Sequence, residues 1–265
     1  MRMGTVRALI ATCALALIAL LPACGTAAAD RSGGGGIPEA SSSEGIPPVT
    51  MPSPSPRPSH APSPRPFPAR FKGTVSALPA DLEAEMRGTT WHPGCPVAIG
   101  RLRLLTLRYW GFDRQVHEGL MVVNESVAGG VVSVFRQMFE ARFRINQMHL
   151  AVKYRPNHDD PNDKRDYTAG FNCRPVVTAL GPGDTWSQHA YGLAIDINPI
   201  ENPYVTSDGY VRNNNAKPFR DRSLRKPGMI HPEDAVVRAF ASIGWRWGGY
   251  WSGDKDYMHF SLTGR

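Results

Sequence analysis

Two short segments in the C-terminal half of this 265-residue chain carry side chains that could hold a metal ion. Residues 187–196, with the sequence SQHAYGLAID, place His189 seven residues before Asp196. Residues 256–259, with the sequence DYMH, end on His259. Imidazole nitrogen and carboxylate oxygen are ligands of catalytic Zn²⁺, which takes three protein ligands and leaves a fourth position to water. His189, Asp196 and His259 make up one such set.

The acid at the start of the second segment, Asp256, has a different use in such a site. A carboxylate beside the metal can act as general base toward the water in the open position. The alternative is that these histidines and acids are separate structural residues, each with its own hydrogen bonds. The occurrence of both motifs in one chain favours the metal site over that alternative.

The element that must position Asp196 is predicted to be a strand over residues 192–198. Side chains alternate between the two faces of a strand, so Leu193, Ile195 and Ile197 would face the core while Asp196 faces away from it. A carboxylate among aliphatic residues needs a partner, because burying it unpaired is costly.

The remaining elements do not form a regular alternation of strands and helices. The chain contains no glycine-rich dinucleotide or phosphate loop and no nucleophile-elbow motif, so nucleotide-binding and serine-hydrolase functions lack support. Apolar spacing predicts further strands over 102–110, 116–123, 148–154, 245–247 and 257–262, helices over 127–143 (with Asn124 as N-cap) and 232–243, and long polar loops over 155–183 and 199–229.

The two motifs together resemble the zinc D-Ala-D-Ala carboxypeptidase and L-alanyl-D-glutamate endopeptidase family. The second motif matches as Asp-x-x-His, where the vancomycin-resistance dipeptidases carry Glu and endopeptidase members accept Asp. The resemblance covers residues 90–265 and implies an α+β, Hedgehog/DD-peptidase-like fold, a small antiparallel sheet with flanking helices and long loops. The first motif, S-x-H-x-x-G-x-A-x-D, is matched at every fixed position: Ser187, His189, Gly192, Ala194 and Asp196.

This resemblance implies a role for each residue of the two segments. His189, Asp196 and His259 would bind one zinc ion, and Asp256 would be the catalytic base. Ser187 would orient His189 or bind substrate, although a serine that only forms the turn is an alternative.

The family also has an arginine upstream, in a Tyr-Arg-Pro context, that binds substrate and stabilises the developing oxyanion. Residues 154–156 have the sequence YRP and make Arg155 the expected catalytic arginine. Arg174, in the segment FNCR of residues 171–174, is the rival. A guanidinium suits either task, because it can hold a carboxylate or an oxyanion.

Residues 1–24 are predicted to be a lipoprotein signal peptide. Arg2 and Arg7 precede an apolar run over residues 8–21, which is shorter than the about 20 residues of a membrane span. The run ends in LPAC, which resembles a bacterial lipobox, so we expect a lipid on Cys24. The alternative is an ordinary signal peptide that is simply cleaved.

Residues 25–70 are predicted to be a linker, because glycine, serine and alternating prolines cannot bury a core. We interpret it as a stalk that holds a zinc peptidase domain, residues 71–265, off the outer face of the membrane. The alternative is a disordered tail without a spacing role.

Two cysteines, Cys95 and Cys173, remain outside the expected signal and lipid site. Exported proteins fold in an oxidising compartment, so a disulfide between them is the simplest outcome. A role as metal ligands is disfavoured, because neither has a C-x-x-C partner.

The net charge of +7 is distributed unevenly along the chain. Residues 1–70 hold six arginines and three acids, which leaves a mild +4 for the remainder. No nucleic-acid partner is expected from so small an excess, although a weak preference for anionic surfaces such as the cell wall is compatible with it.

We therefore expect a monomeric, extracytoplasmic zinc metallopeptidase that acts on peptidoglycan peptides, of the D-Ala-D-Ala carboxypeptidase type. The alternatives are an L-Ala-D-Glu type endopeptidase, a non-catalytic cell-wall-binding module that keeps the fold, and a polyanion-binding surface protein.

Overall fold

The structure is a computed structural model that describes residues 69–153, 160–178 and 181–265. The expected signal peptide, the lipid site Cys24, almost all of the linker and Arg155 lie outside the described residues. The described residues all belong to one unit of the chain, residues 64–265. None of the helices described is long and apolar enough to span a membrane.

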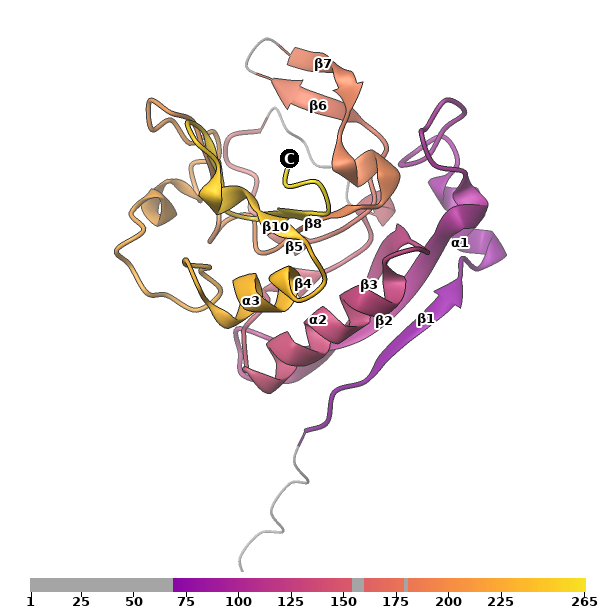
Figure 1. The fold of residues 1–265 in the computed structure, drawn as a ribbon, viewed down its shortest axis with the longest axis horizontal. Coiled ribbons are helices and arrows are strands. Elements are labelled where there is room, and N and C mark those ends of the chain that lie inside the picture. The colour runs from indigo at the N-terminus through magenta and orange to yellow at the C-terminus, as the bar shows by residue number, and fades with distance from the viewer. Residues whose placement is uncertain (1–68, 154–159, 179–180) are drawn as a thin grey trace, which may run out of the picture. The chain divides into compact units, whose positions relative to one another are not determined.

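An antiparallel sheet of three strands in the order β1-β2-β3 forms one side of this unit (Figure 1). Its strands are β1 (Gly73–Ala77), β2 (Leu102–Trp110) and β3 (Val116–Asn124). Leu105, Leu107 and Tyr109 alternate along β2 and are buried, so one face of the sheet is core. The predicted bounds of β2 are confirmed, and β3 runs one residue further than predicted.

Helix α2 (Ala128–Glu140) packs along this sheet, against β1 and β2 (Figure 1). The predicted helix is confirmed, although it is shorter at both ends. Its buried residues recur at helical spacing and form the stripe that meets the sheet: Val131, Val134, Phe135 and Met138.

The predicted helix cap at Asn124 is wrong. Asn124 is the last residue of β3, and Val127 precedes the helix without a side-chain cap. The Asn124 side chain instead donates to the carbonyl of Tyr191 at 3.0 Å, and its backbone N–H donates to the carbonyl of Gly192 at 3.0 Å. This residue therefore ties the first sheet to the turn that carries His189.

A second antiparallel sheet of three strands has the order β10-β12-β8. Its strands are β10 (Arg246–Trp247), β12 (His259–Ser261) and β8 (Ala194–Asp196), and helix α3 (Ala235–Ala241) packs on β10. Strands were predicted at all three places, and the structure has them shorter. Ile195 and Ile197 are fully buried, as the alternation predicted.

One hydrophobic core joins the two sheets and their helices. Phe240 of α3 stacks on Phe260 of β12 with 4.1 Å between the ring centroids. Core members that have no exposed surface occur in β2, β3, α2, β8, α3 and β12, among them Leu105, Leu107, Met121, Val131, Ile195, Phe240 and Phe260.

Short elements connect the larger ones, and several of them lie in the stretches predicted to be polar loops. The predicted strand over 148–154 is wrong, because the strand found here covers only Gln147–Met148 and is followed by a 3-10 helix at Ala151–Lys153. A mixed helix and strand fold results, compatible with the expected α+β class, in several small sheets rather than one. The short strands form three pairs: β4 (Gln147–Met148) parallel to β5 (Tyr167–Thr168), β6 (Pro175–Thr178) with β7 (Gly181–Trp186), and β9 (Tyr204–Val205) with β11 (Lys255–Asp256). The short helices are the α-helix α1 (Ala80–Met86) and the 3-10 helices η1 (Ile99–Arg101), η2 (Ala151–Lys153), η3 (Gln188–Tyr191), η4 (Lys217–Arg220) and η5 (Gly248–Tyr250).

Polar side chains hold the segment after β8 in place. The guanidinium of Arg222 donates to the carbonyl of Glu201 at 2.8 Å, to the carbonyl of Ile230 at 2.6 Å and to the side-chain oxygen of Asn202 at 3.2 Å. Buried carbonyls need such partners, which accounts for the many polar residues in a segment that folds without long strands.

A buried pair of carboxyl groups, Asp166 and Glu201, ties the same segment to residues 160–168. Their side chains are hydrogen-bonded to each other, and only 1% and 6% of the two residues is exposed. Asp166 Oδ2 and Glu201 Oε2 find no N–H or O–H donor among the described residues. Burial, together with the hydrogen bond and the charge of Asp166, raises the pKa of Glu201 to about 9, so the pair shares one proton at neutral pH.

Glu201→Gln is expected to flatten the dependence of stability on pH. Because the pKa of Glu201 is about 9 in the fold and ordinarily 4.5, the wild type loses stability as pH rises through this interval. Glutamine can donate to Asp166 at every pH, so the variant keeps that stability. Urea unfolding at several pH values between 5 and 9 measures the difference, with the exposed-site variant Glu85→Gln as control. Parallel curves for the wild type and Glu201→Gln would contradict the shared proton.

The structure contains the expected disulfide between Cys95 and Cys173, with 6.0 Å between their Cα atoms. The cross-link spans 78 residues of sequence and reaches Cys173 from the turn after α1. A loop of that length restricts the unfolded chain strongly.

Replacing both cysteines by serine is expected to lower the free energy of unfolding by up to about 4.5 kcal/mol, the chain-entropy estimate for such a loop. Urea unfolding followed by tryptophan fluorescence measures it. Reducing the wild type with a thiol should reproduce the loss, whereas the double serine variant should not respond to the thiol. Equal stability of both proteins would show that the cross-link does not restrict the unfolded chain.

Candidate metal centre

Three side chains from separate parts of the sequence meet at one point in the structure. Asp196 ends β8 and His259 begins β12, and the two residues lie directly opposite each other in the antiparallel pair. His189 comes from η3, just before β8. Nε2 of His189 lies 3.2 Å from Asp196 Oδ2, and Nδ1 of His259 lies 3.1 Å from Asp196 Oδ1. The structure thus brings together the three expected ligands.

These separations fit a zinc ion. The two imidazole nitrogens lie 3.3 Å apart, close to their distances from the carboxylate. Ligand atoms at about 2.0–2.1 Å from a tetrahedral zinc are about 3.3–3.4 Å from each other. Two nitrogens and one oxygen are also a donor set that catalytic zinc uses. The group is therefore a candidate metal site whose donors and spacing fit zinc.

One hydrogen bond sets the tautomer of His189. Its Nδ1 donates to the carbonyl of Gly170 at 2.7 Å, which leaves the lone pair on Nε2 directed toward Asp196. Metal-binding histidines in proteins are typically oriented in this way by a carbonyl on the other nitrogen. The ring of His259 is buried and packs against Trp251, with ring centroids 5.7 Å apart.

The turn that carries His189 explains the serine and the glycine of the first motif. The hydroxyl of Ser187 accepts from the backbone N–H of His189 at 3.3 Å and caps η3. Gly192 ends η3 with φ +67°, and a Cβ there would lie 2.6 Å from the backbone nitrogen of Asn124. Ser187 therefore orients the turn, and its contact with substrate stays a prediction.

The extended segment of residues 169–174 lines this turn and the end of β8. This role could not be predicted from the sequence, because backbone groups make the contacts and leave no residue pattern. Its backbone hydrogen bonds reach one residue of the first motif after another: Ala169 pairs with Asp196 at 3.0 and 3.1 Å, Asn172 donates to the His189 carbonyl at 3.1 Å, and the Arg174 carbonyl accepts from Ser187 at 3.1 Å.

Electrostatics keep Asp196 in the form that binds a cation. Burial alone would raise its pKa, but the charges and hydrogen bonds of His189 and His259 outweigh burial and hold the pKa below its ordinary value. Burial lowers the pKa of His259, and the hydrogen bond and charge of Asp196 outweigh that effect and raise it. A metal ion bound here would compete with protons for the same nitrogen and oxygen atoms.

Asp256 lies beside this group without belonging to it. It sits in β11, paired with Tyr204 of β9, and its Oδ1 is buried with no hydrogen-bond partner among the described residues. Burial raises the pKa of Asp256 to about 7, and the negative charge of Asp196 adds to that rise, while His259 and Arg174 oppose it. A carboxyl group with such a pKa can both accept and release a proton near neutral pH.

Of the two candidate arginines, the described residues include Arg174. It is half-buried, and its positive charge acts on the carboxylate of Asp256. Arg174 therefore influences Asp256 electrostatically, and the substrate-binding roles of Arg174 and Arg155 stay predictions.

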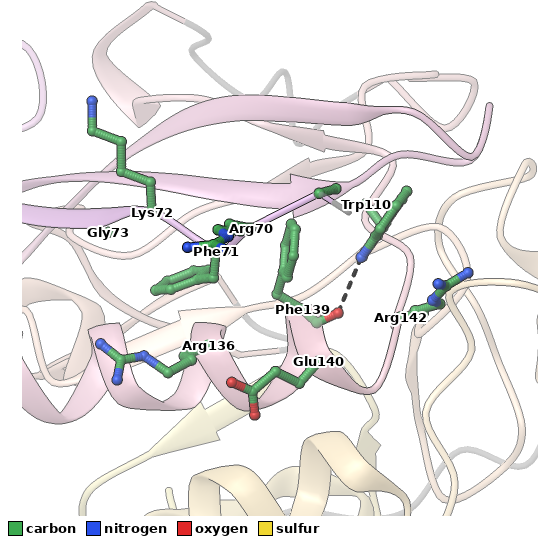
Figure 2. Close-up of a pocket in the computed structure, with 10 residues that line it drawn as sticks. Arg70, Phe71, Lys72, Gly73, Trp110, Arg136, Phe139, Glu140 and Arg142 are labelled. Atoms are coloured by element: carbon green, nitrogen blue, oxygen red, sulfur yellow. Dashed lines mark hydrogen bonds between the residues drawn. The ribbon is translucent and has the colours of Figure 1, made fainter. Parts of the chain in front are cut away.

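A cavity of about 700 Å³ lies away from this centre, over the end of α2 and the start of β1 (Figure 2). Its wall is basic and aromatic, with Arg70, Arg136, Phe71 and Trp110 among the lining residues. Glu140 is its one carboxylate, and it has no histidine or cysteine. This cavity lacks the ligands for a metal, so the chemistry is assigned to the centre of His189, Asp196 and His259.

Replacing either histidine by alanine, His189→Ala or His259→Ala, is expected to abolish zinc binding. Losing a group that is hydrogen-bonded to a metal ligand costs about 10–100-fold in metal affinity, so the loss of a ligand itself should weaken binding further. Elemental analysis after dialysis measures the zinc retained, and His117→Ala, on the exposed part of β3, is the control. A wild type that holds no transition metal and does not respond to added zinc would contradict the site.

Comparison with known sequences agrees with this geometry. The sequence model of a family described as D-alanyl-D-alanine carboxypeptidase matches residues 181–262, which is less than half of the chain. Neither the curated proteins nor the solved structures give a match. The matched segment contains His189, Asp196, Asp256 and His259, but neither candidate arginine. Over residues 181–262 the chain is therefore similar to the D-alanyl-D-alanine carboxypeptidase family, and the family resemblance inferred from the two motifs is confirmed.

Proposed function

We propose that the protein is a zinc metallopeptidase that hydrolyses peptide bonds in peptidoglycan stem peptides. The observation that carries the proposal is the convergence of His189, Asp196 and His259 at zinc-ligand spacing, with Asp256 beside them. The family match over residues 181–262 supports a peptidase of this type. We further propose the Hedgehog/DD-peptidase fold, which the same match implies.

A zinc ion held by the three ligands would supply a Lewis acid for the scissile carbonyl and lower the pKa of a water beside it. Asp256 takes the proton of the attacking water on its carboxylate and then delivers it to the leaving amine. The raised pKa of Asp256 suits both steps, because a group that titrates near the working pH can accept and donate.

The guanidinium of Arg174 is a candidate for holding the substrate. Its charge already acts on Asp256, so an anionic group beside the catalytic carboxylate would lie within its field. It could hold the terminal carboxylate of a peptide or the oxyanion that develops on the scissile carbonyl. Arg155 is the alternative, on the Tyr-Arg-Pro context of residues 154–156.

The bond that we expect to be cut is the D-Ala-D-Ala bond, in keeping with the family description. A specific observation favours a second candidate, the L-Ala-D-Glu type of endopeptidase: the base is Asp256 where some relatives carry Glu. We also propose that the enzyme works outside the cytoplasm, held at the membrane by a lipid on Cys24.

Mass spectrometry of purified stem peptides after incubation with the protein distinguishes these outcomes. Loss of one terminal D-alanine identifies the carboxypeptidase, and a break between L-alanine and D-glutamate identifies the endopeptidase. Binding of peptides without any cleavage, in the presence of zinc, would contradict both and leave the non-catalytic wall-binding module.

Asp256→Asn is expected to reduce turnover by about 10²–10⁴-fold while zinc remains bound. The amide has nearly the shape of the carboxyl group but cannot accept the proton of the attacking water. Turnover of stem peptides and zinc content should be measured on the same preparation. Asp81→Asn, exposed in the first turn of α1, is the control.

Asp254 lies only two residues before Asp256 but is not a suitable control for Asp256→Asn. Its carboxylate accepts hydrogen bonds from the Tyr204 hydroxyl and from the backbone N–H of Ser207, so its replacement would disturb the local structure. If Asp256→Asn loses its zinc, Asp256 is a ligand and its assignment as the base is wrong.

A further inference from the structure

A second group of metal-binding side chains lies at the disulfide. The described residues contain two sets of three such side chains with ligand atoms within 4.8 Å of one another: the candidate zinc centre, and His92 with Cys95 and Cys173. Nε2 of His92 lies 3.6 Å from Sγ of Cys173. In the oxidised protein the two sulfurs are bonded to each other, so they cannot act as thiolate ligands.

We propose that reduction of the Cys95–Cys173 disulfide creates a second metal site, in which two thiolates and the imidazole of His92 bind Zn²⁺ or a similar thiophilic divalent ion. A dithiol reductant passes two electrons and two protons to the disulfide and becomes a cyclic disulfide itself. The two cysteine thiols then lose their protons to solvent as the metal ion binds. Soft thiolates together with imidazole form a donor set typical of zinc.

The imidazole is already oriented for this role. Nδ1 of His92 donates to the carbonyl of Pro93 at 3.0 Å, which leaves the lone pair of Nε2 on the side of Cys173. The ring also packs against Trp186, with 6.1 Å between the centroids. A carbonyl partner on one nitrogen and a sulfur facing the other is the arrangement of a metal-binding histidine.

The backbone around the sulfurs favours a thiolate and holds its position. The N–H of His92 points at Sγ of Cys95 from 3.2 Å, and such a donor stabilises negative charge on sulfur. The N–H of Cys95 donates to the carbonyl of His92 at 3.1 Å and closes a tight turn, with Gly94 at φ +99°. This turn brings the imidazole and the first sulfur to the same side.

The second sulfur comes from a segment that is fixed independently of the disulfide. The N–H of Cys173 donates to the carbonyl of Thr90 at 2.9 Å, and Cys173 is buried. Two sulfurs on one tetrahedral zinc are about 3.8 Å apart, for a Zn–S bond of about 2.3 Å. With 6.0 Å between the Cα atoms, rotation about the two Cα–Cβ bonds can reach that spacing while the backbone stays in place.

The metal would replace the covalent link between Cys95 and the segment of residues 169–174. That segment supports the turn of the candidate zinc centre. A metal ion bound to both cysteines would therefore keep residues 169–174 attached to Cys95 in the reduced protein. This proposal does not depend on peptidase activity, because its ligands are separate from His189, Asp196 and His259.

The test uses the full chain with the candidate zinc centre removed by His189→Ala and His259→Ala, and with Cys13→Ser and Cys24→Ser to exclude other thiols. The protein is titrated with Co²⁺ before and after reduction by a dithiol, which is removed under anaerobic conditions. We expect the ultraviolet charge-transfer absorption of a Co²⁺–thiolate bond to appear only after reduction, to saturate at one ion per chain, and to disappear when Zn²⁺ is added.

His92→Ala in the same background should weaken Co²⁺ binding by at least about 10-fold, whereas His117→Ala should leave it unchanged. Near-UV circular dichroism reports whether the reduced chain stays folded. Absence of the thiolate absorption, equal affinity in His92→Ala, or an absorption seen only in a chain that has lost its near-UV signal would each overturn the proposal.

Discussion

The hydrogen bond from His189 Nδ1 to the carbonyl of Gly170 is the interaction on which the candidate centre depends. It turns Nε2 toward Asp196, and without it the imidazole could present the wrong nitrogen. The carbonyl is held in place because residues 169–174 pair with β8 on one side and with the η3 turn on the other. The cross-link at Cys173 fixes the same segment to the turn after α1. Chain segments outside the two motifs therefore determine the geometry of the ligands.

The pKa values of two neighbouring carboxyl groups, Asp196 and Asp256, are shifted in opposite directions. Asp196 faces two imidazoles, which outweigh its burial and keep it ionised as a ligand. Asp256 is buried with the negative charge of Asp196 nearby, and its pKa rises to about 7. When the pKa values of two carboxyl groups differ in this way, one group stays charged and the other can exchange a proton, as in other enzymes with paired carboxyl groups. The register of β8 against β12 produces the difference, because it sets Asp196 directly opposite His259.

The sequence was sufficient to predict the parts of the fold with long apolar periodicity and the parts with reactive side chains. Strand β2 and helix α2 bury one regular face each, and the ligand set follows from residue types and spacing. The pair β6–β7 and the two-residue strands β5, β9 and β11 were missed, since so few residues carry no periodic signal. Asn124 was misassigned as a helix cap because its actual partners, Tyr191 and Gly192, are distant in sequence. Gly170 acts through its backbone carbonyl, a group that every residue has, so the residue type gave no indication of its role.

X-ray absorption at the zinc edge of the oxidised, zinc-loaded protein tests the central claim most directly. The account predicts nitrogen and oxygen ligands at about 2.0–2.2 Å, outer-shell scattering from two imidazoles, and no sulfur at about 2.3 Å. Both imidazole contributions should come from His189 and His259, so the double alanine variant should not yield this spectrum. A first shell that contains sulfur, or oxygen ligands alone without imidazole scattering, would contradict the assignment of the zinc centre.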